Sequence, residues 1–249
     1  MCGRYTLQRK PADLTAYFAT LAPVDDFPAT WNLAPTQEGL AVRRHPQTGA
    51  RHLDALRWGL VPHWARDSAG AARLINARSE TILDKPSFRE AFARRRCLVP
   101  MDGFYEWLTG AEGKQPFAAA LRDGAPMAVA GLWENWKRPD GGWMRSYCVI
   151  TIASAGRQAL MHARMPVILP PEAWAAWLGE EAAGEAALLE MMRPAEDALL
   201  AFWPVDGRVG RVAENDARLL APAPVELPPA LQALNDPPPG WALAGWAMG

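Results

Sequence analysis

The most strand-like stretch of the chain is Tyr147-Cys148-Val149-Ile150-Thr151-Ile152, which is nearly continuous apolar and rich in β-branched residues. This pattern is typical of a central strand that is buried on both faces. Around it, short apolar segments alternate with Gly and Pro turns from residue 39 to residue 169. The sequence therefore predicts a β-rich core, with strands at 39–44, 52–59, 96–101, 115–121, 127–133 and 144–153.

Helices are expected between and after these strands. Pro11 suits the first position of a helix over residues 11–21, and Ser87 with Glu90 forms a capping-box pattern for a helix that ends at Arg94-Arg95-Arg96. After Pro166 the composition shifts to Ala, Glu and Leu, which predicts short helices at 171–178, 184–192 and 194–203.

We expect one domain over residues 1–226, made of a β-rich part to about residue 169 and an acidic helical part from about 170. Residues 227–249 are a proline-rich tail that we expect to be extended or poorly ordered, although Trp241 and Trp246 could dock it.

The composition sets limits on function. The chain is 50% hydrophobic and 21% charged, as globular proteins are, and lacks both a signal-like apolar segment and a run of about 18 apolar residues. We therefore expect a cytoplasmic protein with no membrane partner. The three cysteines and four histidines show no ligand spacing, so no metal and no cofactor are expected, and Cys97 and Cys148 read as packing residues.

The net charge of −1 conceals an asymmetry. Residues 1–165 hold 22 of the 26 basic residues, whereas residues 166–249 hold 12 of the 27 acidic ones and only four basic ones. Most of the basic residues are Arg, which binds phosphate in a bidentate manner. A polyanionic partner is compatible with this pattern, and so is an arginine-biased genome.

Cys2 carries the most specific chemical signal. Initiator methionine is normally removed before a small residue, which would leave an α-amine and a thiol on adjacent carbons. Such an aminothiol can attack an acyl carbon, or it can condense with an aldehyde to an imine that the thiol closes into a thiazolidine. A chance cysteine at this position is the alternative.

Other polar residues lie within apolar segments. Glu106 lies between two aromatic residues, where desolvation would raise the pKa of its carboxyl group, and Thr151 is the hydroxyl of the central strand. Asn76 is two residues from Arg78, and His162 is two residues from Arg164. Each of these residues also has an alternative interpretation without a function. Asn76 could be a turn residue, Glu106 an exposed strand carboxylate and His162 a core or surface histidine.

Six motifs together resemble the SRAP family, the SOS response-associated peptidases. They are Met1–Tyr5, Trp31–Gln37, Arg57–Trp64, Ile75–Glu80, Gly103–Trp107 and His162–Pro166, in this order along the chain. The resemblance implies an α+β fold with a barrel-like mixed or antiparallel β core and peripheral helices. It also implies DNA-damage-response activity: capture of an abasic site in single-stranded DNA as a covalent crosslink.

The resemblance implies a role for each catalytic candidate. Cys2 matches the family nucleophile, Asn76 the amide that holds the N-terminal residue and the sugar, Glu106 the acid/base and His162 the group that assists ring opening and crosslink reversal. The peptidase in the family name is interpreted as self-removal of the residue before Cys2 or as a historical label, not as a general protease activity.

The resemblance likewise implies the DNA contacts. Arg4, Arg78 and Arg164 match positions that bind phosphate, and Trp64 and Trp107 are candidates for base stacking. Pro35 and Thr36 match the position of a wedge against flanking duplex, and Thr151 is a further candidate DNA contact. The expected partner is single-stranded DNA with abasic sites, including junctions with duplex, and the expected protein is a DNA-associated monomer.

Two other classes of function remain open on the sequence. An amidohydrolase of the glutamine amidotransferase type also opens with Met-Cys-Gly, but it should carry Asn-Gly and Gly-Asp pairs, and neither dipeptide occurs in this chain. A DNA-binding module without a covalent step is the second alternative. Release of ammonia from glutamine would favour the first, and absence of a stable adduct would favour the second.

Overall fold

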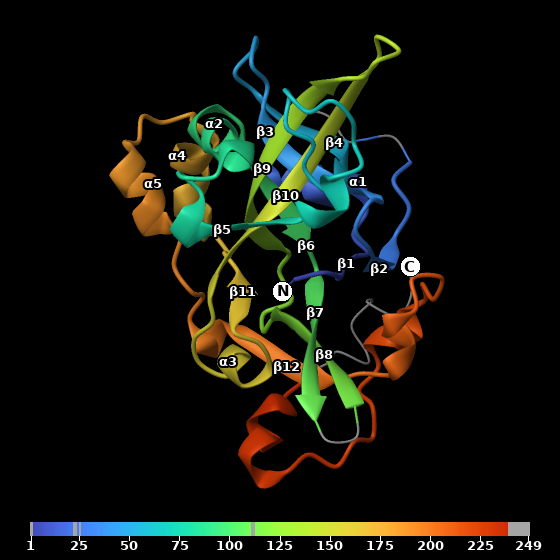
Figure 1. Ribbon diagram of the computed structural model, residues 1–249. Coiled ribbons are helices and arrows are strands. Elements are labelled where there is room, and N and C mark those ends of the chain that lie inside the picture. Colours follow the sequence, from blue (N-terminus) through green and yellow to red (C-terminus); the bar gives the residue numbers. More distant parts are fainter. Residues whose placement is uncertain (1, 22–23, 25, 111–112, 239–249) are drawn as a thin grey trace.

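The computed structural model describes residues 2–21, 24, 26–110 and 113–238 of the 249-residue chain. Within this part, five strands close into a barrel in the order β10-β4-β3-β6-β9 and back to β10 (Figure 1). They are β3 (Glu38–Arg44), β4 (Arg51–Trp58), β6 (Arg96–Met101), β9 (Met127–Lys137) and β10 (Trp143–Ala153). Only the β4–β10 pair of this barrel is parallel. The predicted barrel-like, mixed β core is confirmed.

A second, antiparallel sheet lies beside the barrel. Its order is β12 (Leu200–Pro204), β8 (Gly113–Leu121), β7 (Gly103–Gly110), β1 (Tyr5–Leu7) and β2 (Thr30–Leu33). Two short strands, β5 (Asn76–Arg78) and β11 (Arg164–Pro166), extend the barrel sheet by pairing with β10. Strand β10 therefore closes the barrel and also pairs with both short strands.

Aromatic side chains fill the barrel interior. Tyr5 and Tyr147 share a buried hydrogen bond of 2.6 Å between their hydroxyls, and the Tyr5 ring lies 5.2 Å from the Trp58 ring. Gly39 lies against this pair, and a Cβ atom there would overlap both hydroxyl oxygens. Glycine is therefore required at this close approach.

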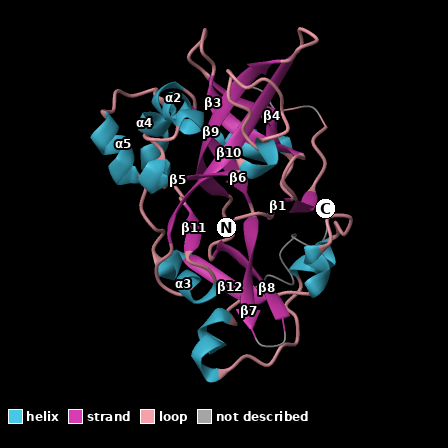
Figure 2. Ribbon diagram, viewed as in Figure 1, coloured by secondary structure: helices cyan, strands magenta, loops and turns pink. Residues whose placement is uncertain are grey.

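The helices lie around the outside of the sheets (Figure 2). They are α1 (Pro11–Phe18), α2 (Pro86–Arg94), α3 (Gln158–Met161), α4 (Trp174–Leu178) and α5 (Glu185–Met191). Short 3-10 helices cover Ala71–Arg73, Ser79–Thr81, Pro171–Ala173, Asp197–Leu199, Gly207–Gly210, Ala217–Leu220 and Pro229–Leu234. In the described part of the chain, no helix combines the length and the apolar character needed to cross a bilayer.

Three helix predictions need correction. The capping box is wrong, because α2 begins at Pro86 after Lys85 and no side chain caps it; the fixed φ of proline starts the helix instead. Helix α1 ends at Phe18, since Ala19 takes a left-handed conformation. The helix at 194–203 is wrong, because residues from Leu200 onward pair with β8 as strand β12.

Residues 227–238 of the proline-rich tail pack on the domain. Leu227 and Leu234 are buried, and the carboxylate of Asp236 forms ion pairs with Arg122 and Arg157. Trp241 and Trp246 lie outside the described residues.

Asn32 joins the N-terminal sheet to the segment that follows β12. Its buried amide donates to the carbonyls of Val209, Arg211 and Glu214 at 3.1, 3.0 and 2.9 Å. The three carbonyls would lose their shared donor if the amide were removed.

Asn32→Ala should therefore lower the free energy of unfolding by about 1–3 kcal/mol, because the partly buried carbonyls of Arg211 and Glu214 lose this donor and a small cavity forms. Urea denaturation measures this change. Asn235→Ala removes an exposed amide and is the matched control. Equal midpoints for the two variants would contradict the role given to Asn32.

Candidate active site around Cys2

The N-terminal segment is held on both sides before it reaches the site. Strand β1 pairs with β2 and β7, and the carbonyl of Arg4 accepts a hydrogen bond from the amide of Tyr105 at 3.0 Å. The buried carboxylate of Asp102 accepts from the amides of Gln8 and Arg9. This pairing brings the start of the chain alongside Glu106 on β7.

Cys2 is fully buried, and its carbonyl accepts a hydrogen bond of 2.9 Å from Nδ2 of Asn76. Asn76 begins β5, where it lies opposite Val149 of β10 in a parallel pair. The indole Nε1 of Trp58 donates to the carbonyl of Ile75 at 3.0 Å, which fixes the residue before Asn76. Trp58 is fully buried and thus also supports the site.

Cys2, Glu106 and His162 influence one another electrostatically. Burial raises the pKa of the Cys2 thiol, and the nearby carboxylate of Glu106 adds to this rise. Burial also raises the pKa of Glu106, and His162, when it is protonated, opposes the rise. A carboxyl group that keeps its proton above its ordinary range can serve as a proton donor near neutral pH.

His162 follows α3 directly and has an extended backbone. Its Nδ1 accepts a hydrogen bond of 3.0 Å from the amide of Arg164. The backbone amide and carbonyl of Arg164 lie 3.0 and 3.2 Å from this nitrogen and set the orientation of the ring.

Arg164 forms an ion pair that the sequence analysis missed. Its Nη1 and Nη2 donate to the two carboxylate oxygens of Glu80 at 2.6 and 2.9 Å, and Nη2 also donates to the carbonyl of Thr151 at 2.5 Å. The hydrogen bond from Arg164 lowers the pKa of Glu80 to about 2. Glu80 ends the motif Ile75–Glu80, but its partner could not be found from the sequence. Arg164 comes close to it because β5 and β11 both pair with β10.

The structure places the remaining expected DNA-contact residues apart from this cluster or at its edge. Arg4 Nη1 donates to the carbonyl of Val209 at 2.9 Å, and Arg78 is exposed at the end of β5. Trp107 is half-buried on β7 and points to the opposite face from Glu106.

Three further residues lie on loops. Trp64, in the loop after β4, is 57% exposed, and Pro35 and Thr36 form the turn between β2 and β3, where Thr36 has a φ of 75°. Among the described residues, no hydrogen bond or ion pair joins these three to Cys2. Their expected roles in DNA binding stay predictions.

The cluster thus offers a thiol, a carboxyl group of raised pKa, an imidazole of fixed orientation and the side-chain amide of Asn76, which binds the carbonyl of residue 2. In the described part of the chain, no group of three or more His, Cys, Asp or Glu residues is placed to hold a metal ion. These groups are suited to nucleophilic and acid/base chemistry at residue 2.

The barrel and this cluster define a class of protein. Residues 1–212 match the family model for the SOS response associated peptidases (SRAP), and the chain belongs to that family.

Two relatives carry names that refer to abasic sites. The abasic site processing protein YoqW of Bacillus subtilis is 32% identical, with 88% of this chain and 99% of YoqW covered. The abasic site processing protein HMCES of Gallus gallus is 30% identical, with 87% and 72% covered.

Solved structures share the fold. A Bacteroides thetaiotaomicron protein superposes with a TM-score of 0.81 over 89% of this chain and 100% of that chain, at 21% identity. A Bordetella bronchiseptica protein gives a TM-score of 0.71 over 82% of this chain and 100% of that chain, at 31% identity.

Glu106→Gln should raise the free energy of unfolding relative to the unsubstituted chain, and the gain should be larger at pH 7 than at pH 4. Because burial raises the pKa of Glu106, the folded state binds the proton more tightly than the unfolded chain, and stability is lost as pH rises above the unfolded value of about 4.3. The amide cannot ionise and avoids this loss; each tenfold difference in proton affinity corresponds to about 1.4 kcal/mol.

Urea denaturation of both proteins at the two pH values measures this difference. Glu226→Gln replaces an exposed carboxylate and is the control. If Glu106→Gln and the unsubstituted chain differ in stability by the same amount at pH 4 and pH 7, burial does not raise the pKa of Glu106.

Proposed function

We propose that this chain processes abasic sites in single-stranded DNA by forming a covalent crosslink through Cys2 after removal of Met1. One observation carries the proposal: the main chain of Cys2 is held by Asn76 in a buried place where the carboxylate of Glu106 acts on the thiol. The names of the relatives YoqW and HMCES support the same class of substrate.

The proposed reaction uses both nucleophiles of residue 2. The free α-amine of Cys2 adds to the C1′ aldehyde of the ring-opened deoxyribose, and Glu106 protonates the resulting hydroxyl, which leaves as water. The iminium ion that remains is attacked by the Cys2 sulfur, while its thiol proton returns to the carboxylate of Glu106. The product is a thiazolidine, and Glu106 ends in the protonation state in which it began.

The other expected site residues have supporting roles in this proposal. His162 assists opening of the sugar ring and reversal of the crosslink. Phosphate contacts fall to Arg4, Arg78 and Arg164, base stacking to Trp64 and Trp107, and the wedge at a junction with duplex to Pro35 and Thr36. The same cysteine and its neighbours would release the residue before Cys2 in a single self-processing step.

Incubation of the Met1-processed protein with an abasic single-stranded oligonucleotide should give a denaturant-stable adduct whose mass is the sum of the two components minus one water. Cys2→Ala should give none, because the imine cannot be closed by a thiol. Mass spectrometry reports the loss of Met1 and the adduct together.

Two controls sharpen this experiment. Cys148→Ala removes another buried cysteine and should leave the adduct unchanged. Borohydride should rescue an adduct with Cys2→Ala, because its α-amine still forms a reducible imine. A stable adduct with untreated Cys2→Ala would exclude ring closure by the thiol. No adduct with the processed chain would exclude the covalent reaction, and ammonia release from glutamine would favour an amidohydrolase.

Glu80→Gln should tighten binding to single-stranded DNA by about two- to fivefold. The exposed ion pair contributes at most about 1 kcal/mol, and its carboxylate competes with phosphate for Arg164. Fluorescence anisotropy with an undamaged oligonucleotide measures the change. Glu226→Gln removes one exposed negative charge elsewhere and should change affinity less. Weaker binding by Glu80→Gln would show that Glu80 orients Arg164 rather than competing for it.

A further inference from the structure

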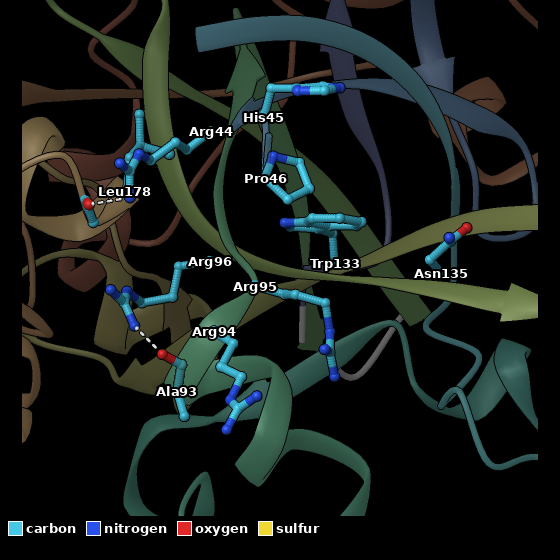
Figure 3. Close-up of a pocket in the computed structure, with 11 residues that line it drawn as sticks. Arg44, His45, Pro46, Ala93, Arg94, Arg95, Arg96, Trp133, Asn135 and Leu178 are labelled. Atoms are coloured by element: carbon cyan, nitrogen blue, oxygen red, sulfur yellow. Dashed lines mark hydrogen bonds between the residues drawn. The ribbon is translucent and has the colours of Figure 1, made fainter. Parts of the chain in front are cut away.

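A cavity lined by arginine lies outside the cluster around Cys2. It has a volume of about 550 Å³ and is formed by the end of β3 and the turn after it, the end of α2, strand β9 and the end of α4. Figure 3 shows the side chains of four arginines around Trp133 and Pro46. These arginines are Arg44, Arg94, Arg95 and Arg96.

The fold forces these positive charges together. The transition from α2 to β6 places three consecutive arginines, Arg94 to Arg96, along one wall. Strands β3 and β6 pair with Arg43 opposite Cys97, and this antiparallel register puts Arg44 opposite Arg96. Like charges directly opposite each other in a sheet are destabilising. The arrangement therefore costs stability unless an anion compensates it.

Carboxylates compensate little of this charge. No Asp or Glu is among the residues that line the cavity. The side chain of Arg44 donates to the carbonyl of Gly179, and that of Arg96 donates to the carbonyls of Trp177, Phe92 and Ala93.

Carbonyl oxygens hold a guanidinium in place but carry no net charge. Of the four arginines, Arg95 alone forms ion pairs within the described residues, with Glu90 and Glu134, and its buried Nε has no hydrogen-bond partner there.

We propose that this cavity, formed by Arg44, Arg94, Arg95 and Arg96, is a second binding site that takes phosphate groups. Guanidinium groups bind phosphate oxygens in bidentate, charge-assisted hydrogen bonds, and their carbonyl contacts hold Arg44 and Arg96 in position beforehand. The phosphate belongs either to a nucleic-acid backbone or to a small free polyphosphate, because both present the same oxygens.

The site is separate from the proposed reaction. None of its lining residues is among the residues expected to act on the abasic sugar or to contact the DNA around it. The inference therefore does not rest on the proposed function, and the two can fail independently.

The test uses the double variant Arg44→Glu with Arg94→Glu and the single variant Arg94→Ala. Both arginines are exposed, and the side chain of Arg94 makes no hydrogen bond or ion pair within the described part of the chain, so the fold should persist. The double variant Lys85→Glu with Arg89→Glu makes the same total charge change at exposed residues outside the cavity, and is the matched control.

Binding is measured by calorimetry with inorganic pyrophosphate and by anisotropy with an undamaged oligothymidylate at several salt concentrations. The double variant should bind the relevant probe about tenfold more weakly than the control, and Arg94→Ala should give a smaller loss. For DNA, the salt dependence should also become shallower by about one phosphate contact for each arginine lost.

The pattern of results distinguishes the two phosphate sources. Loss of pyrophosphate binding supports a free polyphosphate, and loss of oligothymidylate binding alone supports a DNA backbone. Equal binding by the double variant and its matched control with both probes would overturn the proposal. Urea denaturation shows whether the double variant folds, and adduct formation at Cys2 reports on the proposed function separately.

Discussion

Main-chain pairing along β10 is the constraint on which both the barrel and the candidate site depend. Its first part pairs with β9 and β4 and closes the barrel, while Val149 to Ala153 pair with β5 and β11. Because β5 carries Asn76 and β11 begins at Arg164, one strand sets the positions of groups that are about ninety residues apart in sequence. A shift in the register of β10 would therefore disturb the barrel and the site together.

Local sequence predicted the barrel strands well because each is an apolar run with a turn at its ends. The bounds of β6 match the prediction, and β9 and β10 extend it by a few residues. Strand β12 could not be found this way, since Leu200 to Pro204 follow a helix-like Ala/Leu/Glu segment. Their strand conformation comes from pairing with β8, a tertiary contact that overrides local propensity.

The candidate site was predictable as a set of segments, but its internal contacts were not. The motifs contain Asn76, Glu106 and His162. The structure adds that Asn76 binds the carbonyl of Cys2, that Glu106 raises the pKa of the thiol, and that His162 acts on the pKa of Glu106. The Arg164–Glu80 ion pair and the support from Trp58 depend on how β5, β10 and β11 pair. The arginine cavity likewise needs the register of β3 against β6, which no single segment encodes.

The complete burial of Cys2 has a consequence for its lifetime in the cell. Peroxides and alkylating agents react with an exposed thiolate, and oxidation beyond sulfenic acid destroys the nucleophile. A thiol that is shielded from solvent and held in its protonated form is a poor target for such reagents. The fold thus shields this sulfur atom from oxidants dissolved in the surrounding water.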